Sequence, residues 1–203
     1  MAGTLLEGLS RYLGEEELAR LAAPRIGFAG CGGIGSNAAL MLARSGVRRF
    51  LLVDHDTVDA SNLNRQQFMP RDVGRPKAEA LRDRLLELDP ELDVDARVKK
   101  LTEQNADRYV PLADIWVEAF DAPECKRFLV ERVMMAGKHV VSASGLGGWG
   151  APPMRRRELG LLTLVGDFTT DVADHAPFAP RVTEAAALMA DTVFGWILGK
   201  MAD

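Results

Sequence analysis

Cysteine is scarce in this sequence, and the scarcity excludes whole classes of site. Only Cys31 and Cys125 occur among the 203 residues. One chain can therefore build neither a disulfide framework nor a four-cysteine zinc site. We expect no structural zinc, and we interpret both cysteines as small side chains that fill space in the packed interior.

Long apolar runs and a surplus of basic residues are missing too. No stretch approaches the ~20 apolar residues that cross a bilayer. The N-terminal part, with Glu7 and the acidic run 15–17, lacks the basic-then-apolar form of a signal peptide. The net charge is −4, and we interpret the basic run at 155–157 as a solvated strand or loop edge. We expect a cytoplasmic protein that binds neither membrane nor nucleic acid.

What is present is a single domain in which strands alternate with helices. Hydrophobic residues make up 47% and charged residues 27%, as in a soluble protein with an apolar core. Two short helices are expected within 4–22, separated at Gly14. Strands are predicted at 25–30, 50–53, 92–98, 114–120, 139–143 and 159–165, and helices at about 36–45, 76–88, 105–112, 124–136 and 182–199. The alternation predicts an α/β fold with a doubly wound, mostly parallel, Rossmann-like sheet, helices on both faces and a short N-terminal helical segment.

A glycine-rich turn joins the first predicted strand to the helix after it. Gly30, Gly32, Gly33 and Gly35 satisfy the G-x-G-x-x-G pattern. Glycines let the backbone approach phosphate oxygens, and the N–H groups and dipole of the helix N-terminus attract the anion. Asp54, at the end of the next strand, can accept hydrogen bonds from ribose hydroxyls. The pattern predicts a bound nucleotide and fits NAD, FAD and ATP equally well.

The residues after Asp54 favour a triphosphate. The run from Asp54 to Gln66 is too polar for an ordinary strand-to-helix connection. Arg65 and Lys77 are expected on the phosphate side of the sheet, where charge would build if the nucleotide breaks between its α- and β-phosphates. Asp121 follows the fourth strand and is a natural ligand for Mg²⁺. The alternative makes Arg65 and Lys77 solvated surface charges and Asp121 a helix cap.

These motifs together resemble the ThiF/MoeB/HesA family, the bacterial relatives of ubiquitin-activating enzymes. The resemblance runs from about residue 10 to 200 and is nearest to the short ThiF type of thiamine biosynthesis. It rests on Gly30-x-Gly-Gly-x-Gly-Ser36, Asp54-x-Asp-x-Val58, Ser61-Asn-Leu-x-Arg-Gln66, Gly74-x-Pro-Lys77, Phe120-Asp121 and Ala179-Pro-Arg-Val182. We accordingly divide the single domain into N-terminal helices (1–23), a nucleotide-binding core (24–150) and a C-terminal strand, loop and helix (151–203).

The resemblance implies a reaction and roles for these residues. Family members adenylate the C-terminal Gly-Gly carboxylate of a small ubiquitin-fold carrier protein with ATP and Mg²⁺, releasing pyrophosphate. A carboxylate is already ionised at neutral pH, so positioning and charge stabilisation must provide the catalysis. By position, the nucleotide would contact the four loop glycines, Asp54, Asp56, Ser61, Asn62, Arg65, Gln66 and Lys77. Arg65, Lys77 and Asp121 would be catalytic, with Asp121 on the metal, and the carrier would be a ThiS-like sulfur carrier.

Departures from the family pattern limit what is carried over. The family's N-terminal motif has a second arginine, which crosses the homodimer; here Arg11-Tyr12 is followed by Leu13-Gly14. Arg11 either takes over that role or is a surface arginine. The residue after Asp121 is usually Asn and here is Ala122. Longer ThiF proteins carry a sulfur-handling cysteine before the last helix, but residues 166–181 contain none. We therefore expect adenylation only, with sulfur supplied by another protein.

A second glycine-rich segment, Gly145–Gly150, suggests a path for the carrier tail. Together with the loop at 166–181, its small residues could let an extended Gly-Gly backbone pass close by. On this hypothesis, a bulky residue at Gly147 or Gly148 weakens carrier adenylation more than ATP binding.

Three other functions compete with this prediction. An NAD-dependent oxidoreductase would use the glycine loop and Asp54, but it leaves the Ser61–Gln66 run and Lys77 unexplained. A non-catalytic module that only docks a ubiquitin-like protein is compatible with Gly14 and Ala122. The same chemistry on another carrier, for molybdopterin or cysteine-derived metabolites, is equally compatible with every motif.

Overall fold

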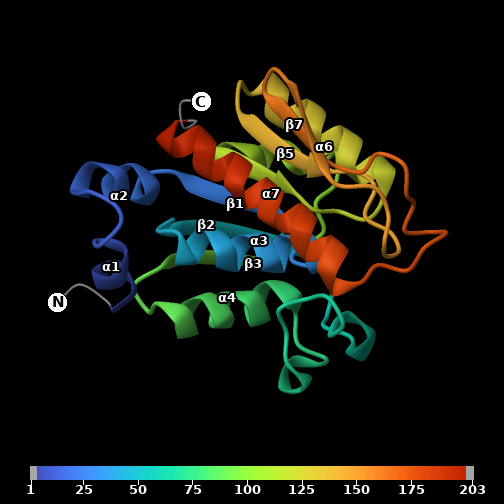
Figure 1. Ribbon diagram of the computed structural model, residues 1–203, viewed down its shortest axis with the longest axis horizontal. Helices are drawn as coiled ribbons and strands as arrows, with labels where there is room; N and C mark the ends of the chain where they lie inside the picture. Colours follow the sequence, from blue (N-terminus) through green and yellow to red (C-terminus); the bar gives the residue numbers. More distant parts are fainter. Residues whose placement is uncertain (1–3, 200–203) are drawn as a thin grey trace.

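The computed structural model describes residues 4–199, which form one twisted sheet with its covering helices (Figure 1). The strands are β1 (Arg25–Ala29), β2 (Arg49–Asp54), β3 (Asp93–Val98), β4 (Ile115–Glu118), β5 (His139–Ala143), β6 (Arg155–Leu159) and β7 (Leu162–Gly166). The α-helices are α1 (Thr4–Leu9), α2 (Glu15–Ala22), α3 (Gly33–Arg44), α4 (Lys77–Leu88), α5 (Ala106–Tyr109), α6 (Pro123–Met135) and α7 (Ala179–Leu198). Short 3₁₀ turns are η1 (Ala60–Asn62), η2 (Pro70–Asp72) and η3 (Val110–Leu112).

The strand order confirms the doubly wound, mostly parallel sheet. The seven strands lie in the order β3-β2-β1-β4-β5-β7-β6, and only the β6–β7 pair is antiparallel. The chain winds outward from β1 through β2 to β3, then returns to place β4 on the other side of β1. The junction of β1 and β4 is therefore the topological switch point, where the carboxyl ends of parallel strands leave a crevice for a ligand.

Both faces of the sheet are covered, which explains why its central strands are apolar throughout. Phe28 and Leu52 face one core, which also contains residues of α3, α4 and α7. Their strand neighbours Leu51 and Val53 face the second core, with Trp116 and residues of α6. In Figure 1, α3, α4 and α7 cover the near face of the sheet.

The predicted break between the N-terminal helices is confirmed. Gly14 is the N-cap of α2, and its N–H donates to the carboxylate of Glu17 at 2.8 Å. Leu21 of α2 is fully buried, whereas α1 contains no buried residue. Helix α2 is thus tied into the domain more firmly than α1.

The prediction of one strand at 159–165 was wrong, because two strands meet there. Gly160, with φ of +66°, turns the chain between β6 and β7. All five residues of β6 are exposed, so the strand shows none of the apolar alternation that would have revealed it. The fourth strand also ends earlier than predicted, at Glu118, so Asp121 lies in the connection to α6 rather than at the strand end.

A buried ion pair fixes the start of α7 to the end of β7. The side chain of Asp167 is fully buried and pairs with Arg181 in the first turns of α7. Asp167 also accepts hydrogen bonds from the backbone and hydroxyl groups of Thr169 and Thr170. Arg181 donates a second hydrogen bond to the carbonyl of Pro152 at 2.8 Å. Three separate chain segments are therefore held together at this point, beside the carboxyl ends of the strands.

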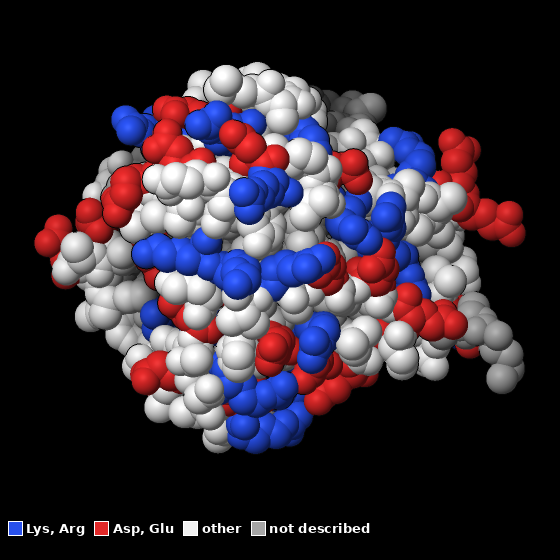
Figure 2. Space-filling model, turned by 180° about the vertical axis from the view of Figure 1, so that it is seen from behind, with Lys and Arg blue, Asp and Glu red and all other residues white. Residues whose placement is uncertain are grey.

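Within residues 4–199, no helix is long and apolar enough to span a membrane. The face opposite the view of Figure 1 carries a band of basic side chains with acidic side chains above and below it (Figure 2). Charges of the two signs are therefore interspersed on this face.

Candidate functional site

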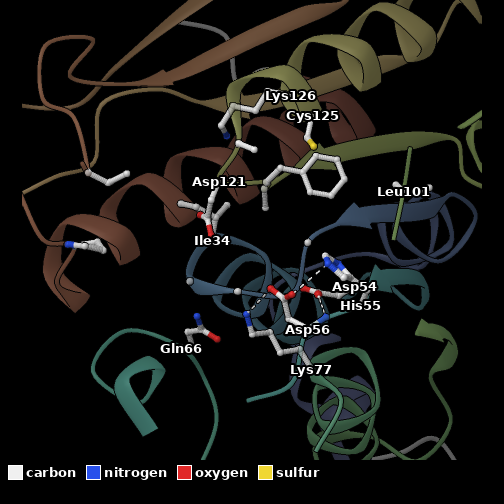
Figure 3. A pocket seen from close by; sticks show the side chains of 18 of the residues that line it. Ile34, Asp54, His55, Asp56, Gln66, Lys77, Leu101, Asp121, Cys125 and Lys126 are labelled. Atoms are coloured by element: carbon white, nitrogen blue, oxygen red, sulfur yellow. Dashed lines mark hydrogen bonds and ion pairs between the residues drawn. The ribbon is translucent and has the colours of Figure 1, made fainter. Parts of the chain in front are cut away.

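A cavity of about 530 Å³ opens at the carboxyl ends of the strands, at the switch point between β1 and β4. Residues from the glycine loop, the ends of β2, β3 and β4, the start of α6 and the loop before α7 line it (Figure 3). Its charged members are Asp54, Asp56, Arg65, Lys77, Lys99, Lys100, Asp121, Glu124 and Lys126. Five cations and four carboxylates give a formal charge of +1, which favours an anionic ligand in a chain of net charge −4.

The four loop glycines have two different roles. Gly30 has a φ of +102°, and a Cβ there would lie 2.6 Å from the carbonyl oxygen of Ala119. A Cβ on Gly35 would lie 2.0 Å from the carbonyl oxygen of Gly30. These two glycines let the chain pack on itself. Gly30 also lines the cavity, together with Gly32 and Gly33 at the N-cap and first residue of the 12-residue helix α3, where unpaired N–H groups and the helix dipole favour a phosphate.

Asp54 holds the glycine loop to β2. Its Oδ2 accepts a hydrogen bond from the backbone N–H of Cys31 at 2.6 Å, and its Oδ1 accepts one from Asp56 at 2.8 Å. A carboxylate has about four acceptor sites, so Asp54 can still accept from a ligand. Burial, together with the charge of Asp54, raises the pKa of the fully buried Cys31 thiol. Cys31 therefore stays protonated, as its interpretation as packing requires.

The two predicted cations differ in how they are held. The ammonium of Lys77 lies 3.1 Å from Asp56 Oδ2, and the lysine side chain is only 10% exposed. Arg65 donates to the carbonyl of Ser61 at 3.1 Å and to the side chain of Asn64 at 2.7 Å. Among the described residues, no carboxylate pairs with Arg65. The solvated-surface alternative is thus wrong for Lys77, and Arg65 keeps an uncompensated charge at the cavity.

Asp121 is not a helix cap. The N-cap of α6 is Ala122, and no side chain caps that helix. The Asp121 carboxylate is exposed, lines the cavity and has no hydrogen bond or ion pair within the described part of the chain. It is therefore a free oxygen donor of the kind that Mg²⁺ prefers. Asp54, His55 and Asp56 form a second group of potential ligands within 4.8 Å of one another, but Asp56 already pairs with Lys77.

Three predicted ligand contacts do not reach the cavity. Gly35 packs on Gly30, and Ser61 and Asn62 are absent from the cavity lining. Asn62 Oδ1 accepts from the backbone N–H of Asp59 at 3.1 Å. Hydrogen bonds from Ser61 lower the pKa of Asp59. Ser61 and Asn62 thus build the turn that carries Arg65 and Gln66, both of which line the cavity.

Several lining residues escaped the sequence-based prediction. Lys99, Lys100 and Leu101 follow directly on β3, and Phe120, Cys125 and Lys126 come from the β4–α6 connection and the start of α6. The Lys99–Lys100 pair does carry a signal, because it directly follows the strand adjacent to β2. Parallel strands end at one edge of a sheet, so this pair was placed beside Asp54 by topology alone.

The glycines at 147 and 148 serve the neighbouring loop, which corrects the expectation that they open a path for a passing tail. A Cβ on Gly147 would lie 2.7 Å from the carbonyl oxygen of Asp171 and 2.8 Å from that of His175. Gly148 forms an isolated parallel bridge with Pro177, and its N–H donates to Ala176 at 3.1 Å. Leu146, Val172 and Pro177 on these two segments line the cavity. The segments together form one cavity wall.

Replacing Gly147 by alanine should therefore displace the 167–178 loop. Because both clashing atoms belong to the backbone, we expect loss of about 1–3 kcal/mol of stability. Limited proteolysis within 167–178 should accelerate, with Gly195→Ala as the control, since that glycine lies in a helix and nothing lies within 4 Å of a Cβ there. Unchanged proteolysis and unchanged stability of Gly147→Ala would contradict this packing.

Comparison with known proteins gives one family. The model of the ThiF family matches residues 6–194. The chain is 35% identical over 135 residues to tRNA threonylcarbamoyladenosine dehydratase of Bacillus subtilis, an alignment that covers 66% of this chain and 53% of the relative. It is 33% identical over 119 residues to the sulfur carrier protein ThiS adenylyltransferase of Escherichia coli, covering 58% of this chain and 47% of the relative. The chain thus spans about half the length of these curated relatives.

Solved structures share the fold. The E. coli tRNA N6-threonylcarbamoyladenosine dehydratase TcdA in complex with ATP superposes with a TM-score of 0.87 at 22% identity, covering 95% of this chain and 93% of that one. E. coli MccB with AMPCPP and MccA gives a TM-score of 0.74 at 26% identity, covering 89% of this chain and 57% of that one.

Proposed function

Because this chain belongs to the ThiF family, we propose that it is an ATP-dependent adenylyltransferase that activates a carboxylate. The substrate favoured by the sequence is the C-terminal Gly-Gly of a small ubiquitin-fold sulfur carrier protein of the ThiS type, serving thiamine thiazole biosynthesis in a cytoplasmic homodimer. The observation that carries the proposal is the cavity itself, where Arg65, Lys77 and Asp121 surround the open end of the glycine loop.

The geometry supports nucleotidyl transfer more than hydride transfer. A dinucleotide's pyrophosphate is largely satisfied by the helix N-terminus. A bound dinucleotide would therefore give Arg65, Lys77 and the free carboxylate of Asp121 no role in binding. A triphosphate that breaks between its α- and β-phosphates uses both cations, because charge builds on the departing pyrophosphate.

In the proposed step, an oxygen of the substrate carboxylate attacks the α-phosphorus of ATP. The bond from that phosphorus to the bridging oxygen breaks, and pyrophosphate leaves with the electron pair. The N–H groups at Gly32 and Gly33 orient the phosphates, and Arg65 and Lys77 stabilise the charge on the leaving group. Mg²⁺, held by the triphosphate and Asp121, would add positive charge at the phosphate oxygens. No general base is required, since a carboxylic acid with a pKa of about 4 is ionised at neutral pH.

A second candidate substrate is favoured by the tRNA threonylcarbamoyladenosine dehydratases among the relatives. A threonyl group joined to a carbamoyl through its amine keeps a free carboxylate, so the same attack on the α-phosphorus is open to it. The two candidates share the reacting group and differ in what carries it, a protein tail or an RNA.

Acceptor-dependent exchange of labelled pyrophosphate into ATP tests the proposal. A Gly-Gly-ending ThiS-type carrier protein and threonylcarbamoyladenosine-bearing tRNA are assayed in parallel, and we expect exchange with the carrier. Exchange only with the tRNA would overturn the substrate but not the reaction. ATP binding without exchange in either arm would indicate a docking module. A melting temperature raised by NAD and not by Mg²⁺-ATP would indicate an oxidoreductase.

We further propose that the reaction ends at the acyl adenylate. Residues 166–181 contain no cysteine, and Cys31 is fully buried. Cys125 does not lie in the packed interior as expected but is half-buried in the cavity wall, so it is the thiol on which an adduct would form. Mass spectrometry of enzyme, carrier and ATP should show no thioester or acyl-disulfide adduct. An adduct on Cys125 would contradict this.

Replacing Asp121 by asparagine should raise the Mg²⁺ concentration needed for half-maximal exchange roughly 10- to 100-fold, because a charged oxygen ligand is lost. Exchange measured against Mg²⁺ concentration gives the shift. Glu124→Gln is the matched control, an exposed carboxylate that lines the same cavity. Equal shifts in the two variants would show that bulk charge, rather than metal ligation, is responsible.

A further inference from the structure

A fully buried carboxylate lies beside the cavity and has no role in the proposed chemistry so far. Glu118 is the last residue of β4 and is 0% exposed. Its Oε1 accepts from the N–H of Phe120 at 2.6 Å, and its Oε2 accepts from the hydroxyl of Ser142 at 2.5 Å. The ammonium of Lys126 lies 3.4 and 3.1 Å from the two oxygens. Its partners come from the β4–α6 connection, from β5 and from the start of α6, beside the switch point.

Such a pair is weakly explained by stability alone. Taking two charges out of water costs several kcal/mol each, and replacing a buried ion pair by apolar groups is often neutral or stabilising. Here only one member is fully buried. The side chain of Lys126 is 26% exposed and lines the cavity. The carboxylate therefore holds a lysine whose outer end remains open to a ligand.

The orientation of Lys126 defines which part of a ligand it can reach. In Figure 3, its nitrogen points to the side of the cavity where Asp121 lies, away from Leu101. Leu101 follows β3, whose last residue, Val98, pairs in the sheet with Asp54, the residue expected at the ribose. An ammonium has three N–H donors, and Glu118 engages it through only two contacts. One donor remains for a ligand on the side opposite the nucleoside.

We infer that Lys126 donates a hydrogen bond to the acyl oxygen of the carboxylate being adenylated. This inference rests on the proposed function. An anionic carboxylate must approach an anionic triphosphate, so a donor at the acyl group is needed to position it. Because Glu118 neutralises the pair, Lys126 offers a directed hydrogen bond without a net charge that competes with Arg65 and Lys77.

In the alternative, Lys126 is only the counter-ion of Glu118. Lys126→Met alone does not separate the two, since it leaves a buried carboxylate uncompensated and is expected to unfold part of the domain. The double variant Glu118→Gln/Lys126→Met avoids this problem. The glutamine carbonyl still accepts from the N–H of Phe120, its amide N–H donates to the Ser142 hydroxyl in place of the present contact, and no buried charge remains.

The test compares two ligands that need no carrier: AMP and the unreactive acyl-adenylate mimic 5′-O-(N-glycylglycyl)sulfamoyl adenosine. Calorimetry gives the ratio of the two dissociation constants, called here the acyl gain. Comparing this ratio between variants isolates the acyl contact, because the replacement of phosphate by sulfamate is the same for every variant. We expect the double variant to lose about 10- to 100-fold of this gain, as for a hydrogen bond from a charged donor. Its dissociation constant for AMP should stay within about twofold, because Lys126 points away from the nucleoside.

Glu118→Gln alone and Glu118→Gln/Lys126→Arg should keep most of the gain, since each retains a donor. Arg127→Met is the surface control, with an 80% exposed side chain on the same helix. An acyl gain equal in wild type and double variant, or a wild type that binds AMP and gains nothing from the acyl group, overturns the role of Lys126 and leaves adenylation standing. A wild type that binds neither AMP nor ATP overturns the proposed function, and this inference with it.

Discussion

Replacing Arg65 by methionine should lower kcat/KM for acceptor-dependent pyrophosphate exchange about 1,000-fold, which corresponds to about 4 kcal/mol of transition-state stabilisation. The loss of rate should be larger for replacement of Arg65 than for replacement of Lys77. Lys77 already shares its charge with Asp56, whereas the hydrogen bonds of Arg65 go to a carbonyl and an amide. Its full charge is available to phosphate oxygens.

The same variant should keep its fold, because Arg65 is half-buried on a turn built by other residues. We expect a melting temperature within about 2 °C of wild type, since surface substitutions rarely cost more than about 0.5 kcal/mol. Arg65→Lys should recover part of the rate, because charge is kept and the planar fork is lost. Arg71→Met, an exposed arginine paired with Glu87, is the control. A comparable loss of rate in Arg71→Met would show that net charge, rather than Arg65, governs the reaction.

Replacing Arg181 by methionine should destabilise the protein by about 3–5 kcal/mol, because it leaves the buried Asp167 carboxylate without its cation. For a domain of this size the melting temperature should fall by roughly 10 °C. The matched control is Arg156→Met. It breaks an exposed ion pair to Asp191, which lies on α7 as Arg181 does, and should cost less than about 1 kcal/mol of stability. If the two variants lose equal stability, the burial of Asp167 does not determine how much the Arg181 ion pair contributes to the free energy of unfolding.

Asp167 also predicts how stability depends on pH. Burial acts to raise the pKa of its carboxyl, but hydrogen bonds from Thr170 and Thr169 outweigh it and lower the pKa to about 2. A carboxyl whose pKa is lower in the folded state stabilises the fold above its unfolded pKa of about 3.9. That contribution, about 3 kcal/mol, should be lost as the pH falls from about 4 to about 2. Urea unfolding at pH 3 and pH 5 should show a smaller difference for Asp167→Asn than for wild type.

Patterns of apolar residues were enough to predict most of the fold, since a strand buried on both faces has an uninterrupted apolar sequence. The signal failed at β6, where no side chain is buried and the sequence of the strand is mostly charged. Element boundaries moved where glycine decided them. Helix α3 begins at Gly33, within the predicted loop, because the phosphate-binding turn is itself the first helical turn.

The site was predictable where spacing along the chain places residues at one sheet edge. Arg65, Gln66, Lys77 and Asp121 do meet in one cavity. Ser61 and Asn62 could not be separated from them, because a motif does not tell which members bind the ligand and which hold the turn. Glu118 gave no signal at all, since its burial depends on partners from β5 and α6. Gly147 was misinterpreted because glycine occurs both where a ligand passes close to the backbone and where another chain segment packs against it, and here the segment at 171–175 does so.

The hairpin of β6 and β7 has a consequence for solubility. Among residues 4–199, β6 is the outermost strand on its side of the sheet, so one row of its backbone N–H and C=O groups has no described strand beside it. Arg155, Arg156 and Arg157 occupy this edge. A second molecule that approached edge to edge would bring like charges together and would have to strip water from both arginine rows. The arginines at 155–157 thus have two effects. They hid β6 from the sequence-based prediction, and they oppose self-association at this edge of the sheet.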